Sequence, residues 1–169
     1  MQSLASGGID RTVKLWRVAD GALLQTMAGH ADRVWRVAFA PDGATIASSA
    51  WDSTAKLWRA SDGTQLQTLK GHTGRVFSVA FTPDGQRLVS SGEDGLVRVW
   101  RLSDGAMIAT LTAQRWELTG CELAQGWRVV QSCQVVPSAN RRVYRAIVAP
   151  QGQRLAFVDG TTLRLALLP

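Results

Sequence analysis

Short apolar or alternating runs, separated by turn signals, recur along the first two thirds of the chain. Each run has the length of a β-strand and is too short for a helix that buries one face. Asp-Gly pairs mark several of the gaps, and two gaps read Pro-Asp-Gly. No segment has a convincing helical period, so the expected fold class is all-β. The pattern predicts strands at residues 3–8, 12–18, 22–27, 34–39, 45–49, 55–59 and 65–69, and a second set over 76–111.

Two of these runs indicate where their strands lie in a sheet. Val37-Ala38-Phe39 is continuously apolar, which predicts a strand covered on both faces. Gln65 to Leu69 alternates between polar and apolar residues, which is typical of an outer edge strand. We therefore expect sheets that are stacked on one another and whose outermost strand faces water.

The runs belong to a repeat with a fixed period. The segment from Gly29 to Trp58 returns, nearly unchanged, from Gly71 to Trp100, and a copy without its first part spans Leu4 to Trp16. A fixed period of this size indicates one supersecondary unit that buries its faces by stacking on its neighbours. The repeated landmarks are Ser6, Ser48 and Ser90; Asp10, Asp52 and Asp94; Trp16, Trp58 and Trp100; and His30 and His72.

These landmarks resemble the WD-repeat β-propeller family, in a variant whose repeats end in Val-Trp or Leu-Trp. The resemblance is close over residues 4–112 and weaker over 143–165. It implies four-stranded antiparallel blades around a central channel, and scaffolding work without a shared catalytic residue. Most such propellers have about seven blades of this length, which is more than the chain supplies.

We therefore predict an incomplete propeller, or one of about four blades. Residues 1–112 are expected to form one blade lacking its first strand and two complete blades. Residues 113–169 are expected to form a degenerate blade or blades, in which Leu165 or Ala166 takes the place of the repeated tryptophan. A segment of a longer propeller, an unusual closure and association of copies all remain open, and open blade edges favour self-association.

Charge and composition add little to this interpretation. The net charge of +6 divides into +2 for residues 1–112 and +4 for 113–169, without a dense basic run, so nucleic-acid binding is not favoured. No apolar run is long enough to span a membrane, and the N-terminus lacks the pattern of a secretory signal. A hairpin around residues 124–126 would keep Cys121 and Cys133 too far apart for a disulfide. Free thiols and a cytoplasmic location are the expectation.

One repeated set of residues invites a catalytic interpretation. His30, Ser48 and Asp52 are the residue types of a hydrolase triad, but the set recurs one period later, which a single active site would not require. The resemblance instead implies structural tetrads of hydrogen-bonded residues, in which the N–H of a buried indole has an acceptor. No spacing resembles a zinc site or a phosphate loop, so we expect no catalytic, metal or cofactor site. The tetrads are His30–Ser48–Asp52–Trp58 and His72–Ser90–Asp94–Trp100.

Trp51 departs from the repeat and is the main candidate for recognition. Its counterparts are Ile9 and Glu93, so the framework does not require an aromatic residue in this turn. Aromatic residues and arginines recur near the same rim, and these types dominate binding surfaces. For Trp35 and Phe77 the alternative is that they pack between blades. The proposed partner-binding set is Arg33, Trp35, Trp51, Arg75, Phe77 and Glu93.

The function expected from the resemblance is a non-enzymatic protein-interaction scaffold that binds proteins or peptides on a propeller face. The alternative is a regulatory or substrate-presenting segment of a larger multidomain signalling enzyme. A weaker third interpretation is a nucleic-acid surface formed by tail arginines such as Arg141, Arg142 and Arg145.

Overall fold

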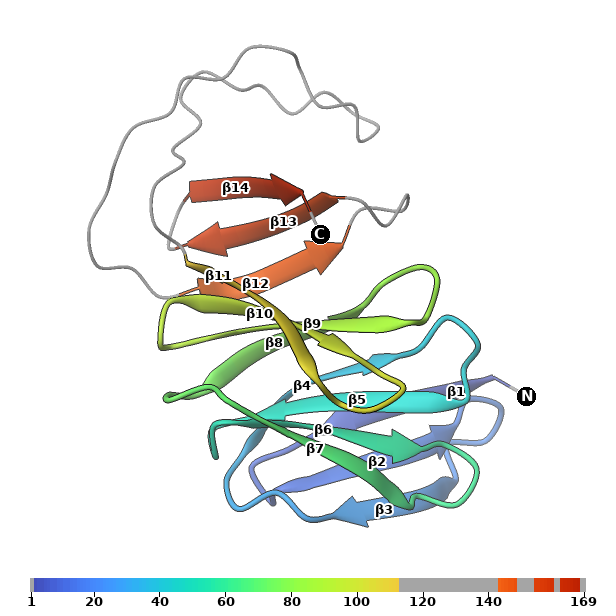
Figure 1. Ribbon diagram of the computed structural model, residues 1–169. Helices are drawn as coiled ribbons and strands as arrows, with labels where there is room; N and C mark the ends of the chain where they lie inside the picture. The colour runs from blue at the N-terminus through green and yellow to red at the C-terminus, as the bar shows by residue number, and fades with distance from the viewer. Residues whose placement is uncertain (1, 113–142, 149–153, 160–161, 168–169) are drawn as a thin grey trace.

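The computed structural model describes residues 2–112, 143–148, 154–159 and 162–167, and all regular structure in these segments is β (Figure 1). This confirms the all-β fold class. Most strand boundaries fall within one residue of the predicted ones. The strands are β1 (Ser3–Gly7), β2 (Thr12–Arg17), β3 (Leu23–Ala28), β4 (Val34–Phe39), β5 (Thr45–Ala50), β6 (Thr54–Arg59), β7 (Gln65–Lys70), β8 (Val76–Phe81), β9 (Arg87–Gly92), β10 (Leu96–Arg101), β11 (Met107–Thr112), β12 (Val143–Val148), β13 (Arg154–Asp159) and β14 (Thr162–Leu167).

The described strands form four antiparallel sheets, each made of consecutive strands. The sheets are β1-β2-β3, β4-β5-β6-β7, β8-β9-β10-β11 and β12-β13-β14. The two complete sheets have the four strands expected of a blade. The first sheet begins at the strand equivalent to β5, so it lacks a counterpart of β4, as the headless first copy predicts.

The sheets pack face to face in chain order. Strand β4 contacts both β1 and β8, and β12 contacts β8 and β9, which gives the layered arrangement seen in Figure 1. Two apolar clusters lie at the described junctions, one around Val13, Met27 and Ile46 and the other around Leu57, Leu69 and Leu88. Burial of such side chains is the main favourable term holding stacked sheets together.

Strand β4 is less covered than its sequence predicts. Val37 is only half-buried, whereas its counterpart Val79 of β8 is fully buried. Ala38 and Phe39 are half-buried, as are their counterparts Ala80 and Phe81. The first sheet has no innermost strand to face β4, but β8 lies between β4 and β12. Strand β4 therefore has a sheet on each side, as predicted, but its apolar run is not fully buried.

The last sheet resolves the alternative at the missing tryptophan. Leu155 of β13 pairs with Ala166 of β14, in the way that Leu88 pairs with Trp100 in the third sheet. Ala166 therefore holds the tryptophan's register position. The predictions for residues 113–142, including the two cysteines and the degenerate strand pair, fall outside the described residues.

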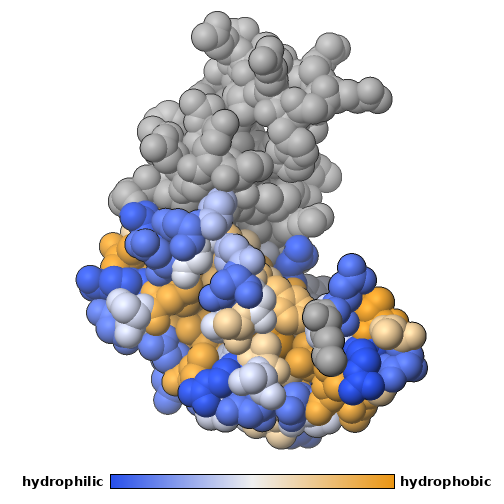
Figure 2. Space-filling model, turned by 90° about the vertical axis from the view of Figure 1, so that its right-hand side faces the viewer, coloured by the Kyte–Doolittle hydropathy of each residue, from blue (hydrophilic) through white to orange (hydrophobic). Residues whose placement is uncertain are grey.

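The first sheet and its turns carry half of the exposed large apolar side chains of the described residues. Leu4, Ile9, Val18 and Leu23 are exposed, and Ile9 reaches 80%. Figure 2 shows apolar patches between hydrophilic ones on the side of the molecule where the N-terminus lies. No helix in the described segments is long and apolar enough to cross a membrane.

Candidate functional site: a tryptophan–arginine cluster between two blades

The repeated histidine, serine, aspartate and tryptophan of the second sheet form one hydrogen-bonded chain. Trp58 Nε1 donates to Ser48 Oγ at 2.7 Å, and Ser48 Oγ lies 2.7 Å from His30 Nε2. His30 Nδ1 lies 2.8 Å from Asp52 Oδ2. The order Trp–Ser–His–Asp is the one that the resemblance implies. It runs from the buried strand β6 to the turn between β5 and β6 and ties both to the loop before β4.

The third sheet repeats this chain with one addition. Trp100 Nε1 and His72 Nε2 each lie 2.8 Å from Ser90 Oγ, and His72 Nδ1 lies 3.0 Å from the Asp94 carboxylate. Arg98 Nη1 donates to Asp94 Oδ2 at 2.7 Å and also lies against His72 Nδ1. The position of Arg98 is taken by Lys56 in the second sheet, where the ammonium donates to Thr68 instead.

Burial and hydrogen bonds set the protonation of these chains. Burial alone would raise the pKa of the Asp52 and Asp94 carboxyls, but their hydrogen bonds together outweigh it and hold both pKa values below the ordinary range. The donors are His30, Thr54 and the Ala31 amide for Asp52, and His72, Arg98 and the Thr73 amide for Asp94. The pKa of His72 is lowered, chiefly because burial disfavours the imidazolium, although Asp94 opposes this. An ionised Asp94 beside a neutral His72 imidazole is suited to a chain of hydrogen bonds that ends at the buried Trp100 indole.

The tetrads have no open face toward a substrate. Ser48 and Ser90 are fully buried, and each hydroxyl already lies between an indole and an imidazole. A nucleophile must reach a substrate, so this geometry favours the structural interpretation of the tetrads. Within the described segments, no group of three or more His, Cys, Asp or Glu side chains could hold a metal ion.

The turns that hold the tetrad aspartates also carry a residue that varies between repeats. Trp51 follows β5, and its backbone N–H donates to the Arg33 carbonyl at 3.0 Å. The matching residue in the next repeat, Glu93, donates to the Arg75 carbonyl at 2.8 Å. The backbone framework is therefore the same in both blades, and it places different side chains at equivalent points.

The side chains form a stack that crosses the junction between the second and third sheets. The Arg75 guanidinium carbon lies 4.0 Å from the centroid of the Trp51 ring, and that of Arg33 lies 4.9 Å from it. Trp35 stacks on Trp51 with ring centroids 5.5 Å apart, and Phe77 meets Trp35 edge-on at 6.2 Å. Cation–π and stacked contacts of this kind fix flexible side chains in place. We call Arg33, Trp35, Trp51 and Arg75 the rim cluster.

The residues of the rim cluster are exposed or half-buried, whereas the aromatic residue beneath them is buried. Trp35 is 55% exposed, both arginines are exposed, and Trp51 is half-buried. Phe77 is only 6% exposed, so its expected place on the binding surface is wrong. It packs under Trp35 because β8 is covered by the sheets on both sides. Glu93 is half-buried, with Oε2 3.9 Å from Arg75 Nε.

The indole N–H of Trp51 is buried without a hydrogen-bond partner among the described residues. A buried donor left unpaired is uncommon in folded proteins and carries a free-energy cost. Trp58 and Trp100, in contrast, both donate to a serine hydroxyl. The framework of the described residues therefore offers the buried Trp51 indole N–H no acceptor.

Sequence reasoning did not identify the contact between Arg75 of one repeat and Trp51 of another, since the register between blades is not visible in one repeat. It also missed Ala44 and Ala60, which line a cleft between the first and second sheets. Their small size could have identified them in the sequence, because the equivalent residues of the next repeat are the larger Gln86 and Leu102.

Comparison with known proteins agrees with the repeat pattern. Residues 21–59 and 63–101 match the family model described as WD domain, G-beta repeat. The mouse F-box-like/WD repeat-containing protein TBL1X is 48% identical over 40 residues, which are 24% of this chain and 8% of that protein. The uncharacterized WD repeat-containing protein sll1491 of Synechocystis sp. is 51% identical over 37 residues, which are 22% of this chain and 11% of that protein. The chain therefore spans a small part of the relatives it matches.

Proposed function

Because the chain belongs to the WD-repeat family through its two matched repeats, we propose that it is a non-enzymatic protein-interaction module. WD-repeat proteins are in general scaffolds for protein interaction. The proposal adds the surface: partner proteins or peptides bind at the rim cluster, where the second and third sheets meet.

The observation that carries this proposal is the Trp51 stack. A framework residue should repeat from blade to blade, but Trp51 is replaced by Ile9 and Glu93 at equivalent points. Its ring nevertheless lies among Trp35 and two arginines that belong to two different sheets. Trp, Tyr and Arg are the residues that most often dominate binding energy, because they offer large contact area and planar hydrogen-bond donors.

Pre-organisation supports the same surface. Trp51 holds both guanidinium groups over its ring, so less side-chain freedom is lost when a partner binds. Exposed Trp35 provides the apolar contact area beside these donors.

Selection from a random peptide library tests the proposal, because it lets the chain choose its own ligands. Peptides displayed on phage are selected on the wild-type chain and counted again on Trp51→Ala and on Ile9→Ala. Ile9 is the matched control, since it occupies the same turn position in the first repeat and is exposed. The proposal expects enriched peptides that lose binding to Trp51→Ala and keep binding to Ile9→Ala. Peptides that bind all three chains equally would contradict the rim cluster as the binding surface.

A further inference from the structure

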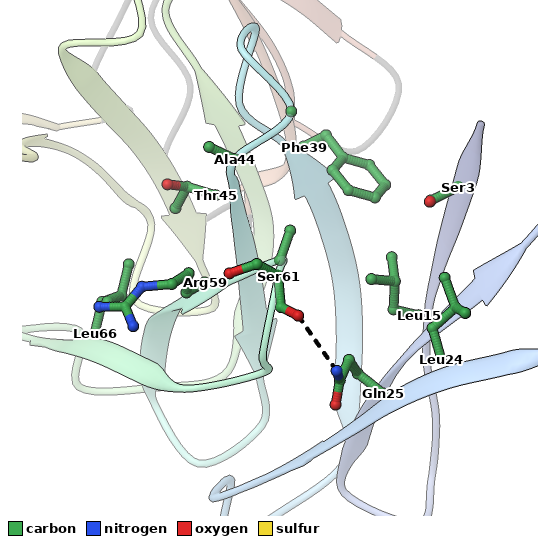
Figure 3. A pocket seen from close by; sticks show the side chains of 12 residues that line it. Ser3, Leu15, Leu24, Gln25, Phe39, Ala44, Thr45, Arg59, Ser61 and Leu66 are labelled. Atoms are coloured by element: carbon green, nitrogen blue, oxygen red, sulfur yellow. Dashed lines mark hydrogen bonds between the residues drawn. The ribbon is translucent and has the colours of Figure 1, made fainter. Parts of the chain in front are cut away.

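A second candidate site lies at the other end of the strands. A cleft of about 890 Å³ opens between the first and second sheets (Figure 3). Thr45 lines it at the start of β5, whereas Trp51 follows the end of β5. The cleft and the rim cluster are therefore separated by the length of a strand.

The walls of the cleft are apolar and its edges are polar. Leu15, Leu24, Phe39 and Leu66 line it. In Figure 3 a hydrogen bond from Gln25 Nε2 to the Ser61 carbonyl, 3.4 Å long, lies between the side chains of the first sheet and those of β6 and β7. Apolar walls with a few polar groups at the edge are typical of a site for an apolar group.

The neighbouring junction shows why this space is open. Ala60 N donates to the Ala44 carbonyl at 2.9 Å, and the equivalent bond in the next repeat joins Leu102 N to the Gln86 carbonyl at 3.0 Å. Leu102 packs against the apolar cluster between the second and third sheets. Ala60 packs against the cluster between the first and second sheets but has a much smaller side chain. The protein thus fills one junction with a leucine and leaves the other unfilled.

The first repeat shows that the small pair belongs to the second repeat alone. There the equivalent backbone bond joins Val18 N to the Gln2 carbonyl at 3.0 Å, so both positions again carry larger residues. Other features of the cleft edge do repeat. The ion pair of Arg59 with Asp62 recurs as Arg17 with Asp20 and as Arg101 with Asp104. The alanines depart from the repeat, and the ion pair belongs to the framework.

We propose that this cleft is a second docking site, which receives a leucine-type side chain from a polypeptide partner against Leu15, Leu24 and Phe39, in the space left by Ala44 and Ala60. The occupant is inferred from the chain itself, because Leu102 is the side chain that packs at the equivalent place. The inference does not rest on the rim cluster, so the two sites can fail independently.

The direct probe is N-acetyl-leucinamide, titrated into the full chain while the leucine methyl signals are followed by NMR. The site predicts saturable shifts at Leu15, Leu24 and Leu66, with no shift at Leu88 in the other junction. N-acetyl-alaninamide should bind at least about tenfold more weakly, because it lacks the branched group that fills the space. Absence of saturable shifts, or equal binding of the two amides, would overturn the proposal.

Two variants exchange the residues at positions 60 and 102, which are equivalent in the second and third sheets. Ala60→Leu introduces the residue found at 102 and should abolish probe binding at Leu15 and Leu24, with the fold retained. Leu102→Ala should create shifts at Leu57, which lies in the second junction. If Leu102→Ala fails to fold, Ala60→Leu alone decides. Unchanged probe binding to Ala60→Leu would contradict the site. Self-association of the wild type that disappears in Ala60→Leu would replace the partner by a second copy and also overturn the proposal.

Discussion

At the scale of single residues, a serine hydroxyl accepts from a tryptophan in each of the first three sheets, but its surroundings differ. Trp16 Nε1 donates to Ser6 Oγ at 2.8 Å with no histidine in the chain of bonds, and Trp16 is only half-buried. Trp58 and Trp100 donate in the same way, are nearly fully buried, and continue into a histidine and an aspartate. The histidine and aspartate therefore accompany a deeply buried indole.

The first prediction concerns the aspartate of that chain. Asp52→Ala removes the acceptor of His30 Nδ1–H, the Ala31 amide and the Thr54 hydroxyl. Leaving a buried donor unpaired costs about 1–3 kcal/mol, so the free energy of unfolding should fall by at least the lower figure. Urea denaturation measures it. Asp10→Ala is the control, because Asp10 is exposed and has no histidine partner. A variant at residue 52 as stable as the wild type would contradict the structural interpretation.

The second prediction is the dependence of stability on pH. Asp52 and Asp94 have folded-state pKa values below the ordinary carboxyl value, so they stabilise the fold above about pH 4 and less as the pH falls below it. The lowered pKa of His72 acts in the same direction, below about pH 6.5. The free energy of unfolding should therefore fall on acidification in two stages. In Asp94→Asn the free energy of unfolding should fall less below about pH 4. A constant free energy of unfolding from neutral pH to below about pH 4 would contradict the protonation states.

At the scale of elements, the turns were the most predictable feature. Asp-Gly pairs marked several of the points where strands stop, and the observed strands end at them. The turn after the second strand of each blade has a residue with positive φ at equivalent positions: Arg11 at 65°, Ser53 at 66° and Gly95 at 71°. Only the last of these is the residue that adopts this conformation without a steric cost.

The third prediction follows from that comparison. Ser53→Gly should raise the free energy of unfolding by up to about 1 kcal/mol, because the relief of backbone strain exceeds the entropy that glycine loses on folding. Gly95→Ala should lower it by about 1 kcal/mol for the opposite reason. Both changes are measured by urea denaturation of the whole chain. A stabilising effect of Gly95→Ala, or a loss of stability in Ser53→Gly, would show that these turns are not under backbone strain.

The sequence could not supply what depends on neighbouring elements. The apolar run of β4 resembles that of β8, yet β8 is the more deeply buried, since sheets cover it on both sides. Phe77 and Trp35 hold the same place in their repeats, but one is buried and the other exposed. Local pattern predicted the strands, and the family resemblance implied the order of the tetrad. Packing between sheets decided which aromatics reach the surface.

At the scale of the whole molecule, the structure is a stack in which each sheet is covered by the next. A repeat of this kind gains its stability from the interfaces between units. The described first sheet and its turns carry four exposed large apolar residues, Leu4, Ile9, Val18 and Leu23. Apolar side chains gathered on one sheet favour contact with another apolar surface.

The fourth prediction is that the chain self-associates through this sheet. Sedimentation velocity over a wide range of concentrations should show reversible association of the wild type. Replacing Leu4 and Leu23 by serine should reduce it, because both are exposed and removing them should not disturb the core. Ile108→Ser on the third sheet is the control, since Ile108 is also exposed. A wild type that stays monomeric throughout, or equal association of all variants, would exclude the first sheet as the contact.

The central claim is that Trp51 serves recognition while Trp58 serves the fold. The most direct measurement compares the dissociation constant of a selected peptide with the melting temperature of Trp51→Ala and Trp58→Ala. Loss of an interface anchor costs at least about 2 kcal/mol, which is roughly thirtyfold in affinity. The account predicts that Trp51→Ala loses this much affinity and melts near the wild-type temperature, while Trp58→Ala melts far lower. It would be contradicted if Trp51→Ala kept full affinity, or if it melted as early as Trp58→Ala.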